Sequence, residues 1–317
     1  IYTLALHDAL PILAFLTWWI ILFITSFLAS LTGLLLSQCL SSVVAIYISI
    51  PLLLIPQILL CGLVVSFSDL TPKSTTGNVP FIGNLIPSRW AYEALAVTSY
   101  TDNEYEKPFF ELDKEKYETM YYNRGFLYEL ESQLETMKDE GDRGKTIDKN
   151  HADVIAENLP FLAEYCGIPP YNQDFSYPTL KDYFAKCEDI LAKRSNEATL
   201  KADAMMANMI RQIGKEAVLE LKRNNYNIKL EEFVIGADQQ RMLEVVKTSL
   251  VPRAGLIFLT PRSTMGCAPF YSSEKILGSQ HINTLWFNMG VMLLMSILVA
   301  ILLFTDCPGR YIRKGEQ

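Results

Sequence analysis

Residues 9–68 read ALPILAFLTWWIILFITSFLASLTGLLLSQCLSSVVAIYISIPLLLIPQILLCGLVVSFS and contain no Asp, Glu, Lys or Arg. A helix crosses the hydrocarbon core of a bilayer with about 20 apolar residues, so this run is long enough for two crossings. The polar cluster Ser37–Ser42 predicts a tight turn between them. We therefore expect transmembrane helices over about residues 12–36 and 41–67, in an integral α-helical membrane protein.

A third uncharged apolar run, Ile282–Thr305, predicts a third transmembrane helix in a segment 284–317 that ends in a basic tail. Between the second and third helices lie 182 polar residues, 102–283, with 30 acidic and 23 basic side chains, and their net charge of −7 equals that of the whole chain. This acidity argues against nucleic acid as a partner, because binding phosphates requires a basic surface. We expect residues 102–283 to form a water-exposed domain separate from the membrane part, residues 1–101.

Basic residues close to the end of a transmembrane helix favour the cytoplasmic side. Arg310, Arg313 and Lys314 follow the last helix, so we expect a cytoplasmic C-terminus and an extracytoplasmic domain at 102–283, in the inner membrane of a bacterium. The chain starts at Ile1 without a basic segment, which argues against a cleaved signal peptide. Residues 6–12 resemble translated sequencing adapter, so it is open whether residues 1–12 are native. We expect the chain to be the C-terminal part of a longer protein.

Hydrophobic spacing predicts mostly helix outside the apolar runs. A short amphipathic helix is expected over about 85–100, with Pro87 near its start, and longer helices over 110–138 and 179–224. Residues 226–236 and 251–260 are candidate strands, although such short apolar runs are ambiguous. A turn-rich link is predicted from the prolines Pro160, Pro169, Pro170 and Pro178.

No motif in the sequence predicts catalysis or a metal site. Gly141–Thr146 ends like a phosphate-binding loop but has two residues between its glycines, where the pattern needs four. The three histidines are far apart in the sequence, and no nucleophile motif of a hydrolase is present. Three methionines in one helical stretch are expected to fill the core: Met205, Met206 and Met209.

The six cysteines divide by expected compartment. Cys39, Cys61 and Cys307 belong to the membrane part and are expected to be apolar thiols. Cys166, Cys187 and Cys267 lie in the outer domain, where an oxidising environment permits one disulfide. Cys166 with Cys187 closes a plausible short loop, but the sequence leaves the pairing open.

Two polar features of the membrane part have alternative interpretations. Gln57, the only amide in the middle of the second apolar helix, is either a substrate contact or an interhelical hydrogen-bonding group. Arg89 and Glu93 are four residues apart on one predicted helix, so Glu93 either pairs with Arg89 at the membrane surface or faces a polar cavity.

The order of these segments resembles the last third of G-type ATP-binding cassette transporters, which belong to the type-2 exporter class. The resemblance rests on Gly33–Gln38, Gly62–Val65 and the segment IPSRWAYEAL at 86–95, and covers about residues 13–101 and 284–314. It implies that 85–100 is a re-entrant helix, in which Arg89, Trp90 and Glu93 match the family's segment. The family's external loop is several-fold shorter than residues 102–283, so the resemblance implies no function for that domain.

The resemblance also implies a transport pathway. The second helix would line the central cavity of a homodimer or heterodimer through Tyr47, Pro51, Ile55 and Ile58, and a valve would fall on Leu63 and Val64. An apolar cavity with an apolar valve suits a hydrophobic or lipid-like cargo. No cofactor is expected in this chain: ATP and Mg²⁺ would bind a nucleotide-binding domain upstream or on a partner. The alternative is a membrane-anchored binding or assembly protein that acts through its outer domain.

Overall fold

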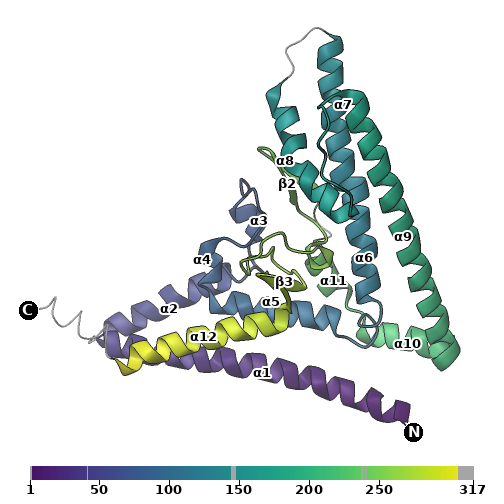
Figure 1. Cartoon of the computed structure of the whole chain (residues 1–317). Coiled ribbons are helices and arrows are strands. Elements are labelled where there is room, and N and C mark those ends of the chain that lie inside the picture. The colour runs from purple at the N-terminus through teal and green to yellow at the C-terminus, as the bar shows by residue number, and fades with distance from the viewer. Residues whose placement is uncertain (1, 41, 144–147, 237–238, 240, 306–317) are drawn as a thin grey trace, which may run out of the picture. The chain divides into compact units, whose positions relative to one another are not determined.

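The computed structural model describes residues 2–40, 42–143, 148–236, 239 and 241–305 (Figure 1). The chain divides into two compact units. Unit 1 contains Ile1–Pro72, Asn78–Asn103 and Pro261–Gln317, and unit 2 contains Lys73–Gly77 and Glu104–Thr260. Residues 261–283, which the sequence predicts to belong to the outer domain, pack with unit 1 instead.

Three helices form the centre of unit 1: α1 (Tyr2–Cys39), α5 (Pro87–Thr101) and α12 (Thr284–Phe304) contact one another pairwise. Their small core contains Ile21 and Ile24 of α1, Trp90 and Ala94 of α5, and Met292 of α12. Most other apolar side chains of α1 and α12 are exposed, as expected for helices whose outer faces meet lipid.

Two described helices are long and apolar enough to cross a membrane, Phe15–Cys39 within α1 and Thr284–Phe304. This agrees with a helical membrane protein. The predicted second crossing is shorter than expected, because α2 spans only Val43–Leu59. Its last turn closes with the Leu60 amide on the Pro56 carbonyl, and the chain then leaves the helix through Gly62, whose φ is +90°. With 17 residues, α2 falls short of the length of a typical crossing.

Short elements complete unit 1. Two one-turn helices, α3 (Phe67–Leu70) and α4 (Phe81–Asn84), precede α5. Strands β3 (Glu274–Leu277) and β4 (Gln280–Asn283) form an antiparallel hairpin with Glu274 opposite Asn283. Asn283 then caps α12, because its Oδ1 accepts the Leu285 amide at 2.8 Å. The hairpin therefore leads directly into the last apolar helix.

Unit 2 is a helical domain with one hairpin. Helices α6 (Phe110–Met120) and α7 (Tyr128–Asp142) continue through a π-helical segment, Tyr121–Leu127, and pack with α8 (Lys149–Cys166) and α9 (Tyr177–Ile213). The core lies among these elements, around Phe126, Leu162 and Phe184. The remaining elements are α10 (Lys215–Asn225), α11 (Ile228–Ile235), β1 (Leu243–Val246), β2 (Ser249–Pro252) and a 3₁₀ turn, Leu256–Phe258.

One buried side chain attaches the β1–β2 hairpin to α8. The side-chain Nδ2 of Asn158 donates to the Thr248 carbonyl at 2.7 Å, and its Oδ1 accepts the Leu250 backbone amide at 3.2 Å. Asn158 and Leu250 are buried, where an unmade hydrogen bond is costly. Asn158 thus fixes the position of the hairpin on the helix.

The expected helices at 110–138 and 179–224 are confirmed, with a break at Gly214 between α9 and α10. Three other predictions were wrong. Within 226–236, Ile228–Ile235 form α11 rather than a strand, capped by Asn227 and ended by Gly236. Pro160 lies inside α8 rather than in a turn. Met205, Met206 and Met209 are not buried, because the last buried residue of α9 is Ala198 and the helix continues beyond the core.

Candidate functional site

A cluster of buried charges joins α5, the β3–β4 hairpin and α12 in unit 1. The Nζ of Lys275 lies 2.9 and 3.1 Å from the two carboxylate oxygens of Glu93. Asn288 donates from Nδ2 to Glu93 at 2.8 Å and to the Trp90 carbonyl at 3.1 Å. Arg89 approaches Glu93 with Nη2 at 3.5 Å. All four polar side chains are at most 1% exposed, so the carboxylate is fully enclosed by donors.

The cluster contains two cations and one carboxylate. Part of the excess positive charge faces aromatic rings: the Arg89 guanidinium lies 3.8 Å from the centroid of Trp90, and Lys275 lies 5.6 Å from the same ring and 5.9 Å from Phe287. Within the described chain, Nε and Nη1 of Arg89 donate to no hydrogen-bond acceptor. Aromatic faces stabilise a desolvated cation by about 2 kcal/mol, so these rings offset part of the cost of the missing second carboxylate.

Local sequence explains how α5 presents this cluster. Pro87 occupies the first turn, and four residues separate Arg89 from Glu93, which places both on one face. The start of α5 is capped by α2: Gln57 accepts the Ser88 amide at 3.1 Å with Oε1, and its carbonyl accepts the Ser88 hydroxyl at 2.6 Å. Of the two interpretations of Gln57, the structure therefore shows the interhelical hydrogen bond.

The predicted Arg89–Glu93 pair is present, but sequence reasoning missed its stronger partners. Lys275 is 182 residues from Glu93 along the chain, and Asn288 is 195 residues away. Two features of the sequence could have indicated these partners. Asn288 is the amide near the start of an otherwise apolar helix, and Lys275 precedes two aliphatic residues in a short strand.

The predicted pathway residues share an uncovered face of α2. No residue of this helix is buried, and Tyr47, Ile55 and Ile58 are 71%, 55% and 58% exposed. Pro51, which was expected between them, is also exposed. The valve residues Leu63 and Val64 are exposed too, and they lie after the end of α2 rather than within it. Their assignment to a pathway stays a prediction.

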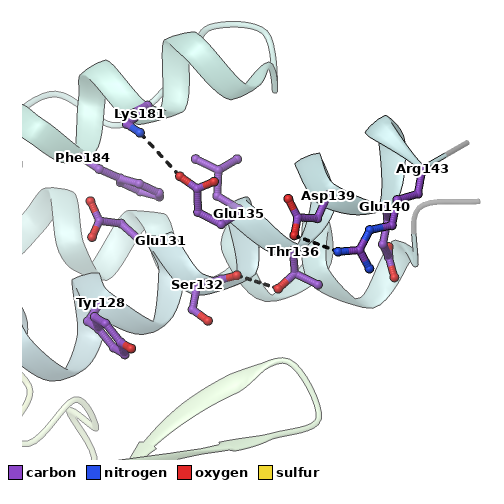
Figure 2. Close-up of a pocket in the computed structure, with 11 residues that line it drawn as sticks. Tyr128, Glu131, Ser132, Glu135, Thr136, Asp139, Glu140, Arg143, Lys181 and Phe184 are labelled. Carbon is purple, nitrogen blue, oxygen red and sulfur yellow. Dashed lines mark hydrogen bonds and ion pairs between the residues drawn. The ribbon is translucent and has the colours of Figure 1, made fainter. Parts of the chain in front are cut away.

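A groove in unit 2 lies between α7 and α9 (Figure 2), with a volume of about 620 Å³. Four carboxylates and two cations line it, and Lys181–Glu135 and Arg143–Asp139 form ion pairs of 3.5 Å each. Burial, with Glu188 and Glu135 nearby, raises the pKa of Glu131. The excess of acidic groups suits a cationic ligand. The carboxylates are Glu131, Glu135, Asp139 and Glu140.

The cysteines are distributed differently from the expectation. Cys166 and Cys187 are both buried in the core of unit 2, whereas Cys267 is exposed and belongs to unit 1. Cys39 and Cys61 are partly exposed rather than buried. Cys307, and with it the basic tail, lies outside the described residues.

The described residues contain no group of three or more His, Cys, Asp or Glu side chains arranged to hold a metal ion. Gly141–Thr146 falls partly outside the described residues, and its first part is the end of α7. The chain matches no known protein-family model, no curated protein and no solved structure.

Proposed function

We propose that this chain is the permease portion of an ATP-driven exporter that moves a hydrophobic or lipid-like cargo and works as a dimer by alternating access. The observation that carries the proposal is α2. It has no buried residue, yet its side chains are almost entirely apolar, and an uncovered apolar helix requires lipid or another protein surface. A second permease half supplies that surface, and the cargo passes between the two.

The geometry of unit 1 supports this proposal in a second way. Gln57 couples α2 to the start of α5, and the buried cluster couples α5 to α12 and the hairpin. Movement of α2 therefore acts on α5, α12 and the hairpin together. In this account Tyr47, Ile55 and Ile58 line the pathway, Leu63 and Val64 close it, and ATP and Mg²⁺ bind a nucleotide-binding domain upstream or on a partner.

Disulfide crosslinking of the complete protein in membranes tests the dimer. Ile55→Cys is placed on α2 in a background from which Cys39, Cys61, Cys267 and Cys307 have been removed. Ile297→Cys on α12 is the matched control, because the two isoleucines are 55% and 56% exposed. We expect a crosslinked dimer with Ile55→Cys and none with Ile297→Cys. Equal crosslinking of both, or of neither, contradicts a dimer built on α2.

The acidic groove favours a second candidate function, a membrane-anchored binding protein whose unit 2 engages a basic partner. Binding of an oligolysine peptide to the purified chain, measured by calorimetry at low salt, tests it. Under this alternative, Glu131→Gln combined with Glu135→Gln weakens binding, while Glu220→Gln on the exposed face of α10 does not. Equal binding by both variants leaves the groove without a role in recognition.

A further inference from the structure

We propose that Cys166 and Cys187 form a disulfide bond that joins the end of α8 to α9. Cys166 is the last residue of α8 and Cys187 lies in the third turn of α9. Both side chains are buried, at 4% and 0% exposure, and their thiol groups are hydrogen-bonded to each other. Two thiols in hydrogen-bonding contact within one core form a disulfide by oxidation and a closer approach of the two sulfur atoms.

Contacts on both sides of the pair hold the two helices in place. Arg194 on α9 donates to the Tyr165 carbonyl at 2.5 Å, and Tyr183 donates to the Pro169 carbonyl at 3.1 Å. These two bonds bracket Cys187 along α9 and Cys166 along the preceding chain. The thiols are thus positioned by neighbouring structure, so the bond can form without rearranging the core.

The two thiols are chemically unequal. The hydrogen bond from Cys187 lowers the pKa of the Cys166 thiol, and the nearby charge of Arg194 acts in the same direction. The same hydrogen bond and burial raise the pKa of Cys187. Cys166 is therefore the thiol that becomes a nucleophilic thiolate first.

Oxidation requires an external disulfide, either a small one such as oxidised glutathione or that of a protein thiol oxidase. The Cys166 thiolate attacks one sulfur of that disulfide and expels the other as a thiolate, which gives a mixed disulfide. Cys187 then loses its proton and displaces the remaining carrier thiolate. The chain loses two electrons and two protons, and the external disulfide is reduced to two thiols.

The bond should increase the stability of unit 2, because the loop that it closes contains Pro169, Pro170 and the long connection between α8 and α9. A disulfide across about 20 residues restricts the unfolded chain, and for a domain of this size we expect the melting temperature to rise by about 5–10 °C. Formation of this disulfide does not depend on transport, so its test is independent of the exporter proposal.

The test uses the purified full chain, oxidised with glutathione disulfide, alkylated under denaturing conditions and digested with trypsin without reduction. We expect one linked product joining peptide 150–181, which contains Cys166, to peptide 187–193. Dithiothreitol should separate the two peptides and lower the melting temperature. Cys267→Ser is the matched control and should preserve the link.

Two results would overturn the proposal. Recovery of Cys166 and Cys187 as alkylated thiols, under conditions that oxidise exposed Cys267, would show that the pair does not form a bond. A linked product of either cysteine with Cys267 would show a different pairing. Comparing the oxidised and reduced forms of the unaltered protein avoids variants that fail to fold.

Discussion

Removing the carboxylate of Glu93 is the perturbation to which unit 1 should be most sensitive. Glu93→Gln keeps the shape of the side chain but leaves Arg89 and Lys275 buried together without an anion. Arg89→Met instead removes the excess positive charge of the cluster. The remaining Lys275–Glu93 pair is neutral and retains its bonds of 2.9 and 3.1 Å. Lys275→Met leaves Glu93 with Arg89 at 3.5 Å.

The structure ranks the three changes. Breaking a buried ion pair by removing one partner costs about 3–5 kcal/mol, and Glu93→Gln also leaves two like charges facing each other. Lys275→Met removes two hydrogen bonds to a charged group, and we expect a loss of about 2–3 kcal/mol. Arg89→Met removes donors that are partly unpartnered and one contact with the Trp90 ring, which gives a loss of about 1 kcal/mol.

Thermal unfolding of the purified protein in detergent, followed by tryptophan fluorescence at fixed pH and salt, measures the ranking. For a unit of this size, about 3–5 kcal/mol corresponds to a fall of about 6–20 °C for Glu93→Gln. The double variant Glu93→Gln with Lys275→Met should lose less than the sum of its parts, since the second change removes one of the two uncompensated charges. A melting temperature for Glu93→Gln equal to or above that of Arg89→Met would refute the reasoning.

Two further predictions concern unit 2. Gly255→Ala should destabilise unit 2 by about 2–4 kcal/mol, because φ is +67° and an added Cβ would lie 2.0 Å from the Tyr117 ring. Gly167→Ala should cost only about 1 kcal/mol, because φ is +69° but the atom nearest to the added Cβ lies at 3.8 Å. Equal melting temperatures for the two variants would refute the packing argument. Burial, with Asp113 and Glu231 nearby, raises the pKa of Glu106 to about 7 from 4.5. The folded unit therefore holds this proton more tightly than the unfolded chain, so it loses stability as pH rises from about 4.5 through 7. Glu106→Gln should remove that loss and gain about 1–2 kcal/mol at pH 8 after allowance for solvent screening; the same pH dependence in both proteins, measured by thermal unfolding between pH 5 and 8, would contradict it.

Predictions from local residue spacing succeeded where a feature lies within one helix. The Arg89–Glu93 pair follows from a separation of four residues, and the helices of unit 2 follow from their apolar periodicity. The approach of Lys275 and Asn288 to Glu93 follows from packing between segments almost 200 residues apart, which periodicity does not encode. The pairing of Cys166 with Cys187 was open in the sequence for the same reason.

The errors have physical causes as well. A short apolar run at 226–236 fits either a strand or a helix, and capping by Asn227 and Gly236 decides for the helix. The second apolar segment was extended to residue 67 because hydropathy does not register the left-handed backbone at Gly62. The exposure of the methionines after Ala198 on α9 depends on how far the core extends along the helix, and this likewise appears only in the fold.

The central claim is that α2 and the segment after it form part of an ATP-driven export pathway. The most direct measurement is movement of a fluorescent lipid by the complete protein in proteoliposomes, with and without MgATP, for the natural sequence and for Leu63→Ala combined with Val64→Ala. The account predicts MgATP-dependent movement that changes in the double variant, while its melting temperature and yield stay near those of the natural protein. Absence of MgATP-dependent movement by the natural protein, or movement of the same rate in a folded, ATP-hydrolysing double variant, would contradict it: the first result rejects the exporter, and the second rejects the valve.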